Sequence, residues 1–131
     1  DQVRHQVYSF SAARSFQLAL YAGRAHPPVV FDRPGLITLG CNIHDAMIGY
    51  IYVTDSPWFG VTGADGSLLL RDLPAGEYTV RVWHPRMAEV TAQLAQRETL
   101  GEGSSVSSFR LARPLRPAMR GGGAEKSWED Y

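Results

Sequence analysis

The amino-acid sequence predicts an all-β protein, arranged as a Greek-key β-sandwich with little helix. Runs of strand length that alternate apolar and polar residues recur along the chain, and Gly, Pro, Asn and Asp separate them. The 131 residues include 13 Gly and 8 Pro, a composition typical of short strands joined by turns. A hydrophobic content of 44% excludes wholesale disorder, because it is enough to build a core.

The N-terminal half is expected to consist of short strands separated by turns. Five strands are expected here, at residues 3–10, 16–21, 29–31, 36–39 and 48–54. In the first of them, alternation places His5 on the same face as Val3 and Val7. The last is rich in β-branched and aromatic residues, so we expect it to be a central strand.

The second half is expected to be rich in hairpins. Asp65-Gly66 and Pro74-Ala75-Gly76 are hairpin and turn signals, and the residues that they separate, 67–70 and 77–84, should form strands. The second of these strands has two distinct faces. One face of that strand should carry Tyr78, Val80, Val82 and His84. Closing strands are expected at 90–94 and 107–111, joined by the polar segment 96–105. The remaining residues, 114–131, combine Pro, Gly and charge, which predicts a disordered tail.

Charge and composition exclude some functions. Thirteen basic and 13 acidic residues give a formal net charge of +0, so the chain has no overall field for a nucleic acid or a membrane surface. It contains no apolar span near the roughly 18 residues that a transmembrane helix needs, and no signal peptide. Its single cysteine cannot form an internal disulfide, so cysteine usage leaves the redox compartment open.

The segment Gly40–Tyr50 contains the residues of the chain that are best suited to bind a metal ion. It contains the only cysteine, together with His44 and Met47, and the three residues Cys41, His44 and Met47 are spaced three apart. A short loop leaving a strand can turn all three side chains toward one point. A thiolate, an imidazole and a thioether form a soft donor set, which suits copper better than hard ions. His5 is the best candidate for a fourth ligand, because it lies on a valine-lined strand face.

This pattern resembles the cupredoxins, in which a distant histidine and a Cys-x2-His-x2-Met loop hold one copper ion. Three stretches are more closely similar to the bacterial cupredoxin-like proteins often labelled methylamine utilization proteins: residues 1–10, 40–52 and 73–85. The resemblance covers roughly residues 1–87. It implies a type 1 copper site with His5, Cys41 and His44 in the equatorial plane and Met47 as a weak axial ligand.

The resemblance also implies a function and a domain organisation. We expect a non-enzymatic, periplasmic electron-transfer protein with a redox partner protein of unknown identity. One domain is expected over residues 1–113, with a copper-site half at 1–56 and a hairpin-rich half at 57–113 that resembles transthyretin-like or carboxypeptidase-regulatory modules. Because a cupredoxin places strands before its first ligand and only four residues precede His5, N-terminal strands of the fold are expected to be missing here.

Alternative functions remain open from the residues alone. The same ligands could serve a copper carrier or store, or the pattern could belong to a structural β-module without metal. Cys41, His44 and Asp45 are poor candidates for a catalytic triad, because residues so near in sequence seldom reach that geometry. Asn42 and Asp45 could orient the loop. For His84, a structural hydrogen bond is favoured over ligation.

Overall fold

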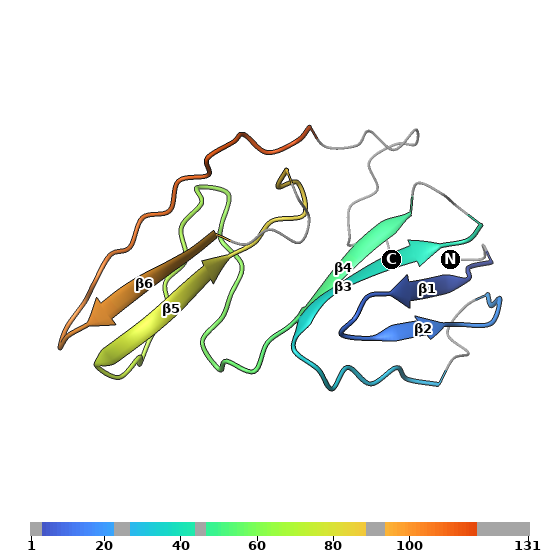
Figure 1. The fold of residues 1–131 in the computed structure, drawn as a ribbon, viewed down its shortest axis with the longest axis horizontal. Coiled ribbons are helices and arrows are strands. Elements are labelled where there is room, and N and C mark those ends of the chain that lie inside the picture. The colour runs from blue at the N-terminus through green and yellow to red at the C-terminus, as the bar shows by residue number, and fades with distance from the viewer. Residues whose placement is uncertain (1–3, 23–26, 44–46, 89–93, 118–131) are drawn as a thin grey trace. The chain divides into compact units, whose positions relative to one another are not determined.

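The computed structural model describes residues 4–22, 27–43, 47–88 and 94–117. Within these ranges the chain forms six strands and no helix, which confirms the all-β prediction (Figure 1). No helix long and apolar enough to cross a membrane occurs among them. The chain divides into two compact units, one containing Asp1–Asp55 and the other Ser56–Ala118, and each is described by itself.

The first unit is built on a four-stranded antiparallel sheet with the strand order β2-β1-β3-β4 (Figure 1). Its strands are β1 (Val7–Phe10), β2 (Ser15–Gln17), β3 (Gly35–Cys41) and β4 (Ile48–Val53). The ladder between β3 and β4 is the longest, running from Gly35 opposite Val53 to Gly40 opposite Ile48. It joins the two strands that flank the proposed metal loop.

β4 is an edge strand of the described sheet, so the prediction that it is central is wrong. Ile48 and Tyr52, which share one face of β4, are 54% and 40% exposed. Composition misled the prediction because β-branched and aromatic residues fit any pleated, partly covered surface, whether the strand is central or at an edge.

The core of this unit lies on one face of the sheet. Ile37 and Ser9 are fully buried on this face, and Cys41 is 5% exposed. Phe16, which is paired with Ser9, packs edge-on against Phe31 at a ring-centroid distance of 6.1 Å. Because side chains alternate along a strand, Cys41 lies on the same buried face of β3 as Ile37.

The second unit contains a two-stranded antiparallel sheet of β5 (Gly76–Val82) and β6 (Leu94–Leu100), paired over their whole lengths. Tyr78, Val80 and Val82 are half-buried while the residues between them are exposed, which confirms the predicted face. Trp58 packs edge-on against Tyr78 at 5.8 Å, whereas Phe59 is 71% exposed. None of the unit's described residues is fully buried.

Several strand predictions need correction. The strand that closes the second sheet is β6, which begins at Leu94, the last residue of the expected strand 90–94, and lies mostly in the segment 96–105 that we expected to be a polar connection. Residues 29–31, 67–70 and 107–111 form no strand, and 90–93 lie outside the described residues. β6 has apolar side chains only at its two ends and at Ala95, and most of its residues are exposed, so its position depends on the backbone ladder with β5 and leaves little hydrophobic alternation to detect.

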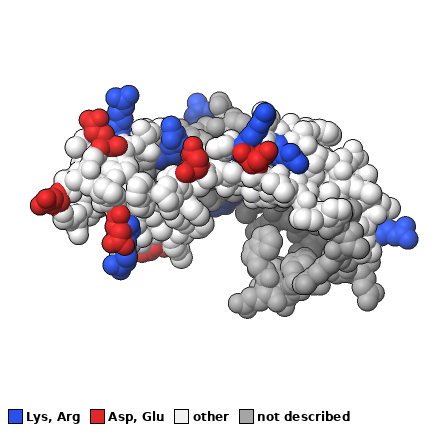
Figure 2. Space-filling model, turned by 90° about the horizontal axis from the view of Figure 1, so that it is seen from below, with Lys and Arg blue, Asp and Glu red and all other residues white. Residues whose placement is uncertain are grey.

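Charged side chains of both signs lie interspersed on the face shown in Figure 2, and the described residues form no single-sign patch there. This distribution agrees with the formal net charge of +0. Residues 114–117, at the start of the predicted tail, form no strand, and 118–131 lie outside the described residues.

Candidate metal centre

His5 is held in place by its backbone. Its amide donates to the carbonyl of Tyr21 at 2.8 Å, and the Tyr21 amide donates back to the His5 carbonyl at 3.0 Å. The two rings lie 6.1 Å apart at a tilt of 50°. This isolated bridge lies two residues before β1, so the imidazole is presented from the end of the sheet.

Cys41 is the last residue of β3 and lies opposite Val7 of β1. His5 is two residues before Val7, so strand alternation puts His5 and Cys41 on one face as diagonal neighbours. The Nδ1 atom of His5 and the Sγ atom of Cys41 are 4.0 Å apart, although 36 residues separate them in sequence. The structure therefore brings together two of the four predicted ligands.

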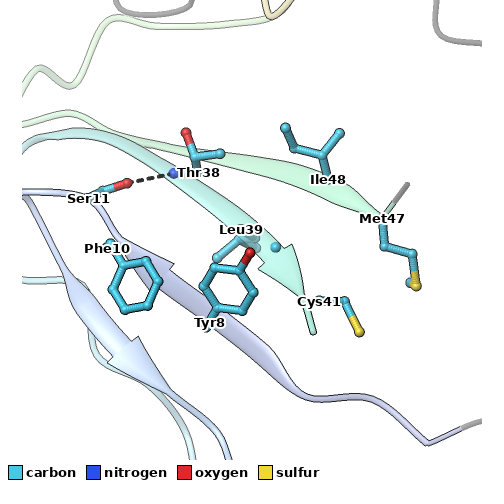
Figure 3. Close-up of a pocket in the computed structure, with 9 residues that line it drawn as sticks. Tyr8, Phe10, Ser11, Thr38, Leu39, Cys41, Met47 and Ile48 are labelled. Carbon is cyan, nitrogen blue, oxygen red and sulfur yellow. Dashed lines mark hydrogen bonds between the residues drawn. The ribbon is translucent and has the colours of Figure 1, made fainter. Parts of the chain in front are cut away.

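Met47 immediately precedes β4, where the pairing of Gly40 with Ile48 ends. Continuing that register by one residue places Met47 opposite Cys41, and directly opposite residues share a face. Met47 is 46% exposed, in contrast to the buried cysteine. Figure 3 shows both sulfur-bearing side chains at the same end of the sheet.

His44 and Asp45 lie outside the described residues. The structure therefore does not place His44, the predicted ligand between Cys41 and Met47. The loop between Cys41 and Met47 is the connection of the β3–β4 hairpin. Within the described ranges, no group of three His, Cys, Asp or Glu side chains could hold a metal ion. The described part of the site consists of His5, Cys41 and Met47.

A cleft of about 410 Å³ opens beside this end of the sheet. Its walls include Tyr8, Phe10, Thr38, Met47 and Ile48, and no Lys, Arg, Asp or Glu of the described chain lines it (Figure 3). Met47 forms part of the wall and is partly exposed, so its side chain contacts both the apolar lining and water.

Sequence reasoning missed Gln6 as a partner of the site and identified only Asn42. The Asn42 amide donates to the Gln6 carbonyl at 3.2 Å, and the Asn42 side-chain Nδ2 donates to Gln6 Oε1 at 3.2 Å. Each of these residues directly follows a predicted ligand. The only signal for this pair is the antiparallel register, which the sequence does not reveal.

His84, in the second unit, has a structural role, as expected. Its Nδ1 accepts a hydrogen bond from the Arg86 amide at 3.1 Å, and its carbonyl accepts one from the Met87 amide at 3.0 Å. These two bonds close the turn that follows β5. The Nδ1 lone pair is engaged by the backbone, so only Nε2 of this ring is left to bind a metal.

The described donors fit a soft metal ion. In protein zinc sites, which have comparable bond lengths, metal–sulfur and metal–nitrogen bonds of about 2.3 and about 2.0 Å sum to about 4.3 Å. The 4.0 Å between His5 Nδ1 and Cys41 Sγ is shorter than this sum, so both atoms could bind the same ion. Thiolate, imidazole and thioether together match the preference of copper.

Comparisons of the chain with protein-family models, with curated proteins and with solved structures found no match.

Proposed function

We propose that the chain binds one copper ion through His5, Cys41, His44 and Met47 and carries single electrons. The observation that supports this most strongly is the 4.0 Å approach of His5 Nδ1 to Cys41 Sγ across 36 residues of sequence. His5, just before β1, thus lies beside the only cysteine of the sequence, at the end of β3. The loop that carries His44 and Met47 begins directly after this cysteine. The bound copper would supply the one-electron couple.

The protein's own residues would restrain this site. Cys41 is 5% exposed, so the fold keeps water away from its sulfur. His5 is held by two backbone hydrogen bonds, and Cys41 ends a strand that is paired on both sides. Donors held by backbone pairing move little when the charge of a bound ion changes, which favours fast electron transfer. Met47, as the weak axial donor, would tune the potential.

The proposal extends to fold type and location. The proposed fold type is a cupredoxin-like Greek-key sandwich with a hairpin region like transthyretin-like modules, which agrees with strands that pair antiparallel in both sheets. Periplasmic location and a redox partner protein belong to the same proposal, and both derive from the resemblance around His5 and the loop from Cys41 to Met47.

A titration of the metal-free full chain with copper(II) tests the proposal. We expect uptake of one equivalent, an intense visible thiolate-to-copper absorption band and the narrow copper hyperfine splitting of a type 1 site in paramagnetic resonance. Cobalt(II), which does not oxidise thiols, provides a second titration of the same donors. Absence of uptake of both metals would leave a structural β-module.

A copper carrier is the second candidate, and the exposure of the site favours it. Met47 is 46% exposed and the neighbouring loop residue Ile43 is 48% exposed, so an incoming ligand from another protein could reach the ion. Carriers exchange copper(I) by stepwise ligand replacement, which requires such access. Tight, colourless copper(I) binding without a stable copper(II) spectrum would establish the carrier and reject electron transfer.

A further inference from the structure

The link between the strand of His5 and the strand of Cys41 is short. β1 and β3 share only two residue pairs, Val7 with Cys41 and Tyr8 with Gly40, whereas β3 and β4 share six. His5 lies beyond the last of these pairs. Short ladders open most readily at their ends. The separation of His5 and Cys41 therefore needs a restraint beyond the ladder itself.

The pair Gln6 and Asn42 supplies such a restraint. Asn42 follows Cys41, Gln6 follows His5, and the two residues are joined by one backbone and one side-chain hydrogen bond, each 3.2 Å long. The backbone bond extends the ladder by one step toward His5. The side-chain bond is a second link between the same two residues, so the start of β1 and the end of β3 are held together next to both donors.

The backbone hydrogen bonds of His5 do not join it to β3. Its two backbone hydrogen bonds join it to Tyr21, on the side of the chain that leads from β2. They orient the imidazole but do not connect it to β3. The two hydrogen bonds between Gln6 and Asn42 do connect the strand of His5 with the strand of Cys41, one residue beyond each donor.

We propose that Gln6 and Asn42 act as a positioning pair that sets how closely His5 Nδ1 approaches Cys41 Sγ. The consequence for a bound metal rests on the proposed function: a looser pair would change the angle between the two donors and shift the spectrum. The effect on the metal-free protein does not depend on metal binding. Neither residue needs to contact the ion.

Metal-free protein provides the first test. Gln6→Ala and Asn42→Ala each remove the side-chain bond, and Gln6→Asn shortens the reach by one methylene while keeping the amide. We expect the Asn42 amide proton to exchange about 2- to 10-fold faster in the Ala variants, as for the loss of one ordinary hydrogen bond. The nuclear Overhauser contact between the His5 ring and the Cys41 β-protons should weaken in parallel.

A matched control and a rescue sharpen this test. Gln96→Ala removes another exposed side-chain bond of a glutamine, from Gln96 Nε2 to Glu98 Oε1 at 2.6 Å within β6, and should leave both readouts unchanged. The double variant Gln6→Asn with Asn42→Gln exchanges the two amides and keeps their combined length, so it should restore both. Wild-type exchange and wild-type contact in Gln6→Ala and Asn42→Ala would overturn the positioning pair.

Cobalt(II) and copper(II) titrations of the same variants provide the second test. With metal bound, Gln6→Ala and Asn42→Ala should keep one equivalent but shift the thiolate charge-transfer band, while Gln96→Ala keeps the wild-type spectrum. Identical spectra in all variants would overturn the effect on the metal. If the wild-type chain takes up neither metal, the proposed function fails, and the metal-free readouts alone decide the positioning pair.

Discussion

The phenol ring of Tyr8 lies directly over Gly40, its partner across β1 and β3. A Cβ atom at Gly40 would lie 2.7 Å from Tyr8 Cζ and 2.8 Å from its hydroxyl oxygen, closer than real Cβ atoms approach other atoms. The absence of a side chain at residue 40 therefore lets an aromatic ring cover the strand immediately before Cys41. Tyr8 also packs at 5.1 Å against the ring of Phe10.

Gly40→Ala should destabilise the protein in the presence of Tyr8. Overpacking of this kind costs about 1–3 kcal/mol, against a gain of about 0.5–1 kcal/mol for Ala over Gly in a strand, so we expect a net loss of about 1 kcal/mol in the free energy of unfolding. In the Tyr8→Ala background the same substitution should be stabilising. Urea denaturation of the four proteins measures this sign change.

Gly49→Ala is the control for that cycle. Gly49 lies in the adjacent strand β4, and a Cβ there would meet only ordinary contacts, 3.7 Å from Leu39 Cδ1 and 3.8 Å from Leu39 Cβ. It should therefore stabilise by about 0.5–1 kcal/mol, with or without Tyr8. An equal loss of stability at both glycines would contradict the contact between Tyr8 and Gly40.

Cys41→Ser should abolish the visible band and most copper(II) affinity. A serine hydroxyl stays protonated near neutral pH and cannot replace a thiolate. Ser and Cys have similar size, so the shape of the core face is kept, but burying a hydroxyl there should cost about 1–3 kcal/mol of stability. Copper titration by absorption and circular dichroism separate the two effects, and an unchanged visible band in the folded variant would remove Cys41 from the site.

Met47→Leu should be milder than the loss of the thiolate. It removes a weak axial donor but keeps side-chain volume, so copper should stay bound with a shifted reduction potential. Because Met47 is 46% exposed, stability should change little. Voltammetry of the loaded protein measures the shift. A potential equal to that of wild type would show that the thioether does not bind the ion.

His5→Ala should open the site, whereas His84→Ala should not. His5 Nδ1 faces Cys41 Sγ at 4.0 Å, while His84 Nδ1 accepts a backbone hydrogen bond in a turn. Removal of His5 should alter the copper spectrum, and added imidazole should restore part of it. Loss of the spectrum in His84→Ala alone would mean that the second unit supplies the imidazole.

Asp65 should titrate below its usual range. The Ser67 backbone amide, followed by the Ser67 hydroxyl, donates hydrogen bonds that hold the pKa of the carboxyl below its usual value of 3.8. A depressed folded pKa contributes stability that is present above pH 3.8 and is lost as pH falls through the folded value. Carbon-13 NMR of the carboxyl measures this pKa, and Ser67→Ala should raise it part of the way toward 3.8 because the backbone bond remains. A wild-type value at or above 3.8 would contradict the turn geometry.

Some features of this protein could be predicted from sequence because they arise within one segment. The alternation of Tyr78, Val80 and Val82 reports one face of β5, since the period of a strand is a local property. The strands that flank the loop from Cys41 to Met47 were predicted for the same reason, because apolar runs on both sides of the loop have strand length.

Only the tertiary structure decided the features that depend on which strands pair and in which register. The edge position of β4 and the location of β6 follow from strand order and from a backbone ladder that carries no side-chain signal. The sequence indicated His5 as a partner for Cys41, but the 4.0 Å between them and the pairing of Gln6 with Asn42 arise from the register of β1 against β3. A shift of one residue in that register would move His5 to the opposite face, because side chains alternate along a strand.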